Sequence, residues 1–447
     1  MHSHSATQRR AWVVDVNMGY GHSRPAHALR DLCGGTVLSA NDYPGIPDHD
    51  KTSWQRSRQL YEWFSRAQPI PYIGPLIFKA LDRFQQIPAF YPNRDLSAPN
   101  LQVRQMYAMM RRGFGKHLIE TLQKEPLPLL TTFFLPAFMA EYFDYPGDIY
   151  CLTTDADISR AWVPLDPARS RIRYFASNGR VVERLKLYGV QESRIFLTGF
   201  PMPKELIGGT SAEHLKSVLS RRLCQLDPHG YFHEIYFRTL KAELGIERCA
   251  VVKQDRPLTL LYMVGGAGAQ RSVGVEILSS LKGLLKRKQL RLVLSAGSRH
   301  DIADYFASAV RDLGLQKLLP TWIDIPRPAS RLAYFEEFPA LLEQADILWT
   351  KPSEMSFYTG LGLPIILTDP IGSQEEFNRT WLQYVGGGTP QFPPRWAGEW
   401  LMDWRDSGAL ARMAWNGYVE APTHGTYRIE DTILGRPWDL RHLPMII

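Results

Sequence analysis

The chain has 447 residues, of which 45% are hydrophobic and 22% charged, and its formal net charge is +7. The composition excludes a disordered chain, and the length predicts two domains of roughly 150–200 residues each plus extra segments. The longest apolar stretch, residues 126–143, is interrupted by prolines and by Glu141. It falls short of the roughly 20 clean apolar residues of a transmembrane helix, so we expect no membrane span.

The cysteines and the N-terminus bear on the cellular compartment. Four cysteines are scattered without C-x-x-C spacing: Cys33, Cys151, Cys224 and Cys249. We therefore expect neither a disulfide framework nor a metal site, and a location in the reducing cytoplasm. The polar segment 1–10 predicts no signal peptide. The positive charge suits an anionic partner such as a nucleotide or a phospholipid surface, and it is equally common in proteins without such a partner.

The first half of the chain alternates strand and helix patterns. An apolar run over residues 11–16 leads into a glycine turn, and Ser23 is then expected to cap a helix that carries Pro25 in its first turn and runs through Leu32. Strand, glycine turn and helix form the βα unit of a parallel sheet. Further strands are predicted over 129–134, 149–153, 173–176 and 195–198, and helices over 102–124 and 180–187.

A second alternating series begins near Pro257. A buried strand is predicted over 258–264, followed by a glycine cluster and a helix over 273–286. Strands over 291–295, 347–350 and 364–368 alternate with helices over 302–313 and 355–361, which predicts a second doubly wound domain.

These patterns predict an α/β protein with four parts. We expect an N-terminal Rossmann-like domain over 1–202 and a C-terminal one over 256–395. Residues 203–255, with helices over 212–226 and 231–244, are interpreted as a helical insertion on the first domain. Residues 396–447 are interpreted as a helical tail that packs back on the first domain.

The turn Gly19-Tyr20-Gly21-His22 is the first candidate site. A glycine turn between strand and helix presents backbone N–H groups to a ligand at the carboxyl end of the sheet, where ligands bind in such folds. Histidine ionises near neutral pH, so His22 could accept a proton from an acceptor hydroxyl. The alternative is a turn that merely requires glycine, with His22 hydrogen-bonded nearby.

The second half carries three further candidates. The cluster Gly265, Gly266 and Gly268 resembles a phosphate-cradling loop, but it lacks the Lys-Ser/Thr of a P-loop and the acidic residue of nicotinamide sites. Ser353 is predicted to cap a helix that could bind a diphosphate, and Glu354 could accept hydrogen bonds from ribose hydroxyls. The alternatives are an ordinary turn and an ordinary capped helix.

Amide and carboxylate side chains gather in the third of these candidates, over residues 371–379. Gln374, Glu375 and Asn378 suit the recognition of sugar hydroxyls. Taken individually, they fit the polar, solvated start of a helix better.

The order of these motifs resembles a known group of enzymes. These are the monogalactosyldiacylglycerol synthases and the N-acetylglucosaminyl transferase that makes the lipid precursor of peptidoglycan. The resemblance covers most of residues 11–388 except roughly 203–255, and it rests on 19–22, 153–162, 175–201, 265–268, 347–351, 362–367 and 372–378. In three places the sequence departs from the family. The glycine-rich segment usual after Thr350-Lys351 is shortened to Pro352-Ser353-Glu354, Phe357 stands where a glutamate is usual, and Ser159-Arg160-Ala161 stand where a histidine is usual.

The resemblance implies a GT-B glycosyltransferase, with two Rossmann-like domains facing a cleft. It implies a UDP-sugar donor on the second domain, an acceptor alcohol on the first, and inverting displacement that uses neither a metal nor a cofactor. His22 would be the base and Asp155 a second catalytic candidate. Gly21, the Gly265–Gly268 loop and Ser353 would adjoin the diphosphate. Gln374 and Glu375 would contact the sugar.

An aromatic and basic stretch over residues 54–91 bears on the acceptor. Aromatic residues including Trp54, Trp63 and Phe64 are interleaved with arginines and lysines, which suits a membrane interface with anionic head groups. The stretch corresponds in place to the lipid-facing region of the resembled synthases, so a membrane lipid is an expected acceptor at the inner face of the membrane. The alternative is an aromatic packing layer. No nucleic-acid partner is expected, since no nucleic-acid-binding motif is present.

The activity predicted from the sequence is therefore hexosyl transfer from a nucleotide-sugar. Two alternatives remain open: a nucleotide-sugar 2-epimerase on the same fold, and a non-catalytic nucleotide-sugar binding protein.

Overall fold

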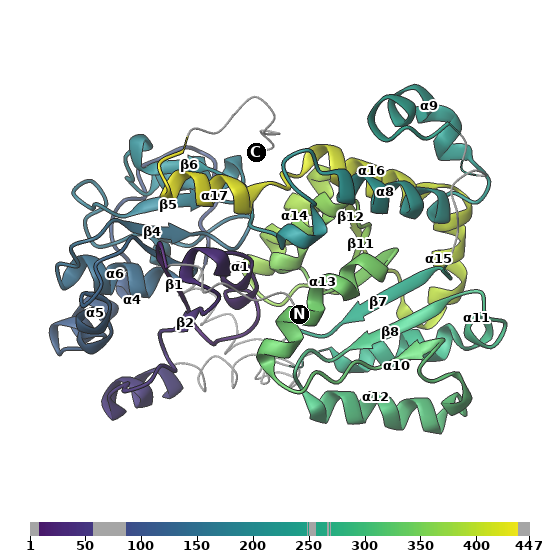
Figure 1. Ribbon diagram of the computed structural model, residues 1–447, viewed down its shortest axis with the longest axis horizontal. Helices are drawn as coiled ribbons and strands as arrows, with labels where there is room; N and C mark the ends of the chain where they lie inside the picture. The colour runs from purple at the N-terminus through teal and green to yellow at the C-terminus, as the bar shows by residue number, and fades with distance from the viewer. Residues whose placement is uncertain are drawn as a thin grey trace. The chain divides into compact units, whose positions relative to one another are not determined.

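The computed structural model describes residues 9–56, 86–247, 249, 256–265, 268 and 270–436. The chain forms two compact units (Figure 1). The first unit comprises residues 1–203, 371–378 and 424–447, and the second comprises residues 204–370 and 379–423.

The first unit is built on a six-stranded sheet of order β2-β1-β3-β4-β5-β6, in which every neighbouring pair is parallel. The strands are β1 (Trp12–Asp15), β2 (Leu38–Ser39), β3 (Leu129–Thr131), β4 (Ile149–Leu152), β5 (Arg173–Ala176) and β6 (Ile195–Leu197). The helices are α1 (Ser23–Ala28), α4 (Leu101–Arg111), α5 (Lys116–Leu122), α6 (Phe134–Tyr142), α7 (Gly179–Leu187) and α17 (Gly425–Ile433), with 3-10 turns η1 (Arg30–Cys33), η2 (Arg160–Trp162) and η3 (Glu192–Arg194).

Both faces of this sheet are buried in a hydrophobic core. Successive side chains of a strand point to opposite faces, so neighbouring residues enter different cores. Val13 packs on one face with Leu130 and Ile429, whereas Val14 packs on the other with Leu129. Ile429 belongs to α17, the yellow helix in Figure 1, whose Thr426 hydroxyl donates to the Met202 carbonyl at 2.5 Å. The C-terminal helix α17 therefore completes the core of the first unit.

The second unit has a parallel sheet of order β12-β11-β10-β7-β8-β9. Counted from the β9 edge, its strands follow the 3-2-1-4-5-6 order of dinucleotide-binding folds. The strands are β7 (Thr259–Met263), β8 (Arg291–Ser295), β9 (Ile323–Asp324), β10 (Ile347–Thr350), β11 (Ile365–Leu367) and β12 (Gly388–Pro390). The predicted α/β class with two Rossmann-like domains is confirmed.

The helices of the second unit include two elements from the segment that the sequence suggested as an insertion on the first domain. These two elements are α8 (Glu213–Leu226) and α9 (Tyr231–Leu244). The other helices are α10 (Arg271–Ser280), α11 (Lys282–Lys286), α12 (His300–Asp312), α13 (Arg331–Gln344), α15 (Ala397–Asp406) and α16 (Ala409–Glu420), with 3-10 turns η4 (Lys204–Leu206), η6 (Gln316–Leu318), η7 (Glu354–Leu361) and η8 (Pro394–Trp396). Helix α14 (Ser373–Val385) begins in the first unit and ends in the second.

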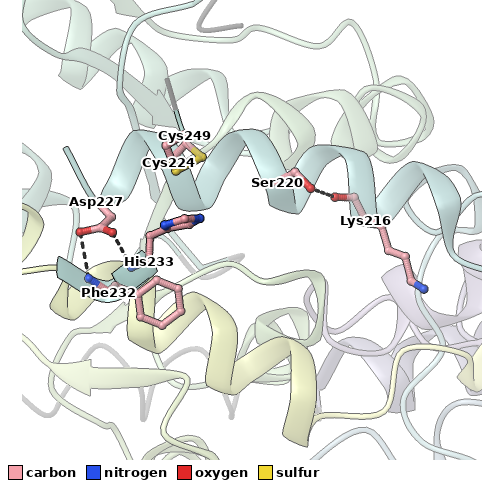
Figure 2. Close-up of a disulfide and its surroundings, with 7 residues drawn as sticks. All are labelled: Lys216, Ser220, Cys224, Asp227, Phe232, His233 and Cys249. Carbon is pink, nitrogen blue, oxygen red and sulfur yellow. Dashed lines mark hydrogen bonds between the residues drawn. A yellow bond between two sulfur atoms is a disulfide. The ribbon is translucent and has the colours of Figure 1, made fainter. Parts of the chain in front are cut away.

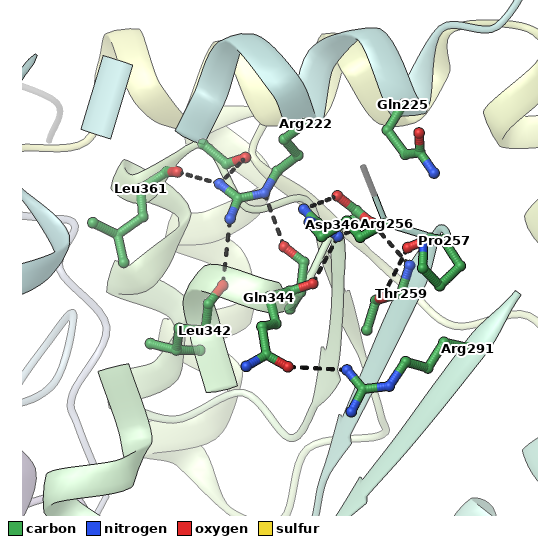
Figure 3. Close-up of polar contacts among 12 residues, drawn as sticks. Arg222, Gln225, Arg256, Pro257, Thr259, Arg291, Leu342, Gln344, Asp346 and Leu361 are labelled. Atoms are coloured by element: carbon green, nitrogen blue, oxygen red, sulfur yellow. Dashed lines mark hydrogen bonds and ion pairs between the residues drawn. The ribbon is translucent and has the colours of Figure 1, made fainter. Parts of the chain in front are cut away.

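A fully buried arginine fastens α8 within the second unit (Figure 3). The Arg222 guanidinium donates to the carbonyls of Ala345 at 3.0 Å, Leu361 at 2.6 Å and Leu342 at 3.3 Å. These carbonyls lie at the ends of α13 and η7, so one side chain satisfies the orphan acceptors of two helix ends. Helices α8 and α9 therefore pack in the second unit, unlike the expected placement on the first domain.

The expectation that the chain has no disulfide is wrong for one pair of cysteines. Cys224 and Cys249 are bonded, with their Cα atoms 5.2 Å apart (Figure 2). Cys224 lies near the end of α8, and the chain returns through α9 before it reaches Cys249, so the two meet across a separation of 25 residues. Spacing along the sequence does not reveal such a pair. Cys33 and Cys151 are free and buried.

Several element boundaries differ from those expected from the sequence. His22, and not Ser23, is the N-cap of α1, and the helix ends at Ala28. The helix expected over 102–124 is two helices, because Gly113 and Gly115 adopt positive φ angles of 94° and 81° between them. Of the helices that the structure describes, none is long and apolar enough to cross a membrane.

Candidate functional site

Each sheet has one position at which the chain order reverses, and the loops there diverge to leave a crevice at the carboxyl ends of the strands. In the first unit this position lies between β1 and β3, and in the second it lies between β7 and β10. His22 follows β1, and Gly265 follows β7. The sequence motifs therefore fall at the switch point of their own sheet, where ligands bind in open α/β folds.

Thr132, the residue that follows β3, makes hydrogen bonds to both the backbone and the imidazole ring of His22. The Thr132 hydroxyl donates to the His22 carbonyl at 2.7 Å, and the Thr132 carbonyl lies 2.9 Å from His22 Nδ1. Because a carbonyl oxygen only accepts, Nδ1 carries the proton in this contact. The neutral imidazole then has its lone pair on Nε2, which is the tautomer that a general base requires. The Thr154 hydroxyl oxygen lies 3.3 Å from the same Nδ1.

His22 borders a cavity of about 400 Å³ in the first unit. Asp155, Gln374 and Trp54, three other candidates from the sequence, line the same cavity. The His22 ring meets Phe133 in an edge-to-face contact at 4.9 Å between centroids. The structure thus brings together four residues that are separated by up to about 350 positions in the sequence.

Asp155 is oriented by Asn378. The Asn378 amide donates to Asp155 Oδ1 at 2.9 Å, and its amide oxygen accepts the Ala156 N–H at 2.7 Å. Asn378 is fully buried, so both ends of its amide serve the loop after β4. The sequence suggested that Asn378 contacts the sugar. The side chain orients the Asp155 carboxylate, and its contact with the sugar stays a prediction.

Glu375, Gly21 and Trp54 are the other candidates of this unit that the structure describes. Glu375 is buried, and one oxygen of its carboxylate accepts the Ile371 N–H at 2.7 Å at the start of its own helix; its contact with the sugar stays a prediction. Gly21 is half-buried in the turn before His22. Trp54 is 5% exposed and packs on Phe114, which favours the packing-layer interpretation at this position. The membrane candidates Trp63 and Phe64 lie outside the described residues.

The segment that departs from the resembled family has a structural role at Arg160. Its buried guanidinium donates to the carbonyls of Ser97 at 2.6 Å and Pro164 at 3.0 Å, and burial lowers the pKa of Arg160. These bonds hold the turn that carries Trp162, a wall of the cavity.

In the second unit, Gly265 lies against a lysine, Lys351, which the sequence analysis did not single out as a site residue. A Cβ atom built on Gly265 would lie 2.8 Å from Lys351 Cε, so the absence of a side chain there leaves room for Lys351. Lys351 follows β10, directly across the switch point. Its position in the sequence, directly after a predicted strand and before the predicted cap at Ser353, could have identified Lys351 as a site residue. Gly268 has a φ of 75°, and Gly266 lies outside the described residues.

The predicted cap at Ser353 is confirmed, since its hydroxyl accepts the Met355 N–H at 3.3 Å. Glu354 is buried in the first turn of η7, and its assignment to ribose stays a prediction. Phe357 packs against Trp381 at 4.7 Å between ring centroids, so this departure from the family supplies core packing. Within the described ranges, no group of three or more His, Cys, Asp or Glu side chains could hold a metal ion.

Comparison with known proteins gives one family match, to part of the chain. A model described as "Domain of unknown function (DUF6938)" matches residues 239–334, too little of the chain to assign it to that family. The sequence matches no curated protein.

Several solved structures resemble the whole chain. MnaA from S. aureus in its UDP co-structure is 10% identical with a TM-score of 0.47, over 96% of this chain and 99% of that one. UDP-GlcNAc 2-epimerase from Neisseria meningitidis bound to UDP-GlcNAc is 14% identical with a TM-score of 0.46, over 96% and 100%. MurG from Acinetobacter baumannii is 12% identical with a TM-score of 0.45, over 96% and 100%. Likenesses at this level of identity do not indicate an activity for this chain.

Proposed function

We propose that this chain is a glycosyltransferase that moves a hexose from a nucleotide-sugar, with UDP as the expected nucleotide, to an acceptor hydroxyl. The observation that carries the proposal is His22: the Thr132 carbonyl fixes its Nδ1–H, and the ring borders a cavity at the switch point of the first sheet. A base in that tautomer suits the activation of an alcohol.

The acceptor oxygen forms a bond to the anomeric carbon while the bond between that carbon and the diphosphate oxygen breaks. The acceptor proton passes to Nε2 of His22, and the nucleoside diphosphate leaves. Asp155, oriented by Asn378, offsets the positive charge that develops on the cavity side of the imidazolium. Inversion at the anomeric carbon is expected for a single displacement.

The donor is assigned to the switch point of the second sheet. Lys351 beside Gly265 supplies a cation for the departing diphosphate, and the capped turn at Ser353 supplies backbone N–H groups. Changing Lys351 to Met should weaken UDP binding at least about tenfold, as measured by calorimetry. Lys286, which is exposed at the end of α11, provides the matched control in Lys286→Met.

The test of activity is the release of nucleoside diphosphate from a panel of UDP-, GDP- and TDP-sugars, with and without acceptors. We expect His22→Ala and His22→Gln to lower kcat by about 10²- to 10⁴-fold, and His300→Ala, at an exposed histidine of α12, to leave it unchanged. Full activity in His22→Gln would refute the base assignment.

Two alternatives are outcomes of the same assay. A 2-epimerase would convert the donor into its 2-epimer without any acceptor, which product analysis detects. The mainly apolar lining of the cavity favours transfer over epimerisation. A transferase must bind an acceptor beside His22, whereas an epimerase binds none. UDP binding with no turnover of any donor would indicate a non-catalytic binding protein.

A further inference from the structure

The cavity beside His22 has walls whose chemistry limits what an acceptor can be. One face of α4 lines it with Gln102, Gln105, Met106 and Met109 at spacings i, i+3, i+4 and i+7. Aromatic rings from four other segments form most of the remaining wall: Trp54, Phe114, Phe133, Phe134 and Trp162.

The aromatic rings of this wall meet one another at angles. Phe134 contacts Trp162 at 5.2 Å and 62°, and Trp54 contacts Phe114 at 5.4 Å and 53°. Rings arranged in this way offer faces and edges to a further ring, which prefers the same tilted or offset contacts. The thioether of Met109 adapts to a bound ring and makes favourable sulfur–aromatic contacts.

Six of the sixteen residues that line the cavity are polar, and the other ten are apolar. His22, Asp155, Ser159 and Gln374 line it together with the two glutamines of α4. A sugar acceptor carries a hydroxyl on nearly every carbon, and each one buried against Met or Phe would lose its hydrogen bonds to water without replacement. An acceptor with one hydroxyl on an apolar body avoids that loss.

The size of the cavity points in the same direction. A volume of about 400 Å³ lies near the lower end of small-molecule sites, which span roughly 300–1,000 Å³. This volume suits a body of one or two fused rings and not a pair of long acyl chains.

We propose that the acceptor is a compact apolar alcohol, with an aromatic or fused-ring body in the α4 cavity and its hydroxyl at His22. This inference rests on the proposed function and names the acceptor class for it. It replaces the membrane lipid that the sequence resemblance suggested.

The test uses 2-naphthol as the probe on the full-length protein. Its binding is measured by calorimetry without any donor, and its glycoside is sought by mass spectrometry after incubation with the nucleotide-sugar panel. Glucose and vesicles containing dioleoylglycerol are the competing acceptors. Met109→Trp, which fills the cavity, should weaken naphthol binding at least about tenfold and leave UDP binding unchanged. Arg104→Trp, on the exposed side of the same helix, should change neither.

The outcomes separate this inference from the proposed function. Naphthol binding that Met109→Trp abolishes, with formation of the glycoside, supports both. The same binding without turnover of any donor supports the cavity assignment and refutes the transferase. Transfer to dioleoylglycerol or glucose without naphthol binding overturns the acceptor class and leaves the transferase standing. If Met109→Trp does not fold, Met109→Gln, which adds polarity at constant size, should weaken naphthol binding in the same direction. Wild-type protein that binds no naphthol overturns the inference.

Discussion

Asn378 provides a sharp test of how the candidate site is held together. In Asn378→Ala, the Ala156 N–H loses its acceptor at 2.7 Å, and Asp155 loses a donor at 2.9 Å. Ala156 is buried, so its orphaned N–H costs about 1–3 kcal/mol. The lost donor to Asp155 costs less, about 0.5–1 kcal/mol, because this half-exposed carboxylate can be rehydrated. We expect a total loss of about 1.5–4 kcal/mol in the unfolding free energy of the first unit.

Two measurements check this expectation locally. Hydrogen exchange followed by mass spectrometry should show the Ala156 amide exchanging faster in Asn378→Ala than in the wild type. The kcat of transfer should fall about ten- to a hundredfold, because the Asp155 carboxylate is no longer oriented. Gln383→Ala, at an exposed position of the same helix, is the matched control and should alter neither quantity. Unchanged exchange at Ala156 together with an unfolding free energy within about 0.5 kcal/mol of wild type would refute the positioning role.

Asn378→Asp extends the test to pH. The new carboxylate would face Asp155 at hydrogen-bonding distance, and two such groups cannot both ionise without repulsion. The folded-state pKa of the pair is then raised above the unfolded value. The stabilising contribution is therefore present at low pH and lost as the pH rises through the folded pKa. Denaturation at pH 5 and pH 8 should show the variant closer to wild type at the lower pH, and an equal deficit at both would contradict the argument.

Three further predictions concern other parts of the fold. Because the Cys224–Cys249 disulfide closes a loop of 25 residues, the change Cys249→Ser should lower the unfolding free energy of the second unit by about 3 kcal/mol, and thiol titration of the denatured wild type should find only the two other cysteines. Arg222→Leu should lower the free energy of unfolding, measured with denaturant, by about 3–5 kcal/mol, since it leaves buried carbonyls of α13 and η7 without donors. A decrease under about 1 kcal/mol would show that water replaces the guanidinium. Burial raises the pKa of Asp50, so the wild type loses part of its stability as the pH rises through the folded pKa; Asp50→Asn should flatten that dependence, as measured by thermal unfolding from pH 4 to 8.

The alternation of strands and helices could be predicted from the sequence because buried parallel strands are short apolar runs bounded by turn residues. The strands over 173–176, 291–295 and 347–350 have the predicted bounds. The helix that begins at Phe134 was missed, because the apolar residues of β3 continue into it without a polar break. Element type is a local property, whereas the boundary between two apolar elements depends on what packs against each.

The sequence by itself singled out His22 from a glycine turn, Gln374 from a strand end and Trp54 from aromatic spacing, and the family resemblance added Asp155. Only the tertiary structure decided that they share one cavity, because that depends on the strand order, in which β3 lies beside β1 although about 110 residues separate them. The burial of the Asn378 side chain against Asp155 was likewise decided by the tertiary structure. Its partner, the loop at Asp155, lies 223 positions away in the sequence. Local patterns determine which elements form, but contacts at such separations are fixed only when the whole sheet has assembled and buried both of its faces.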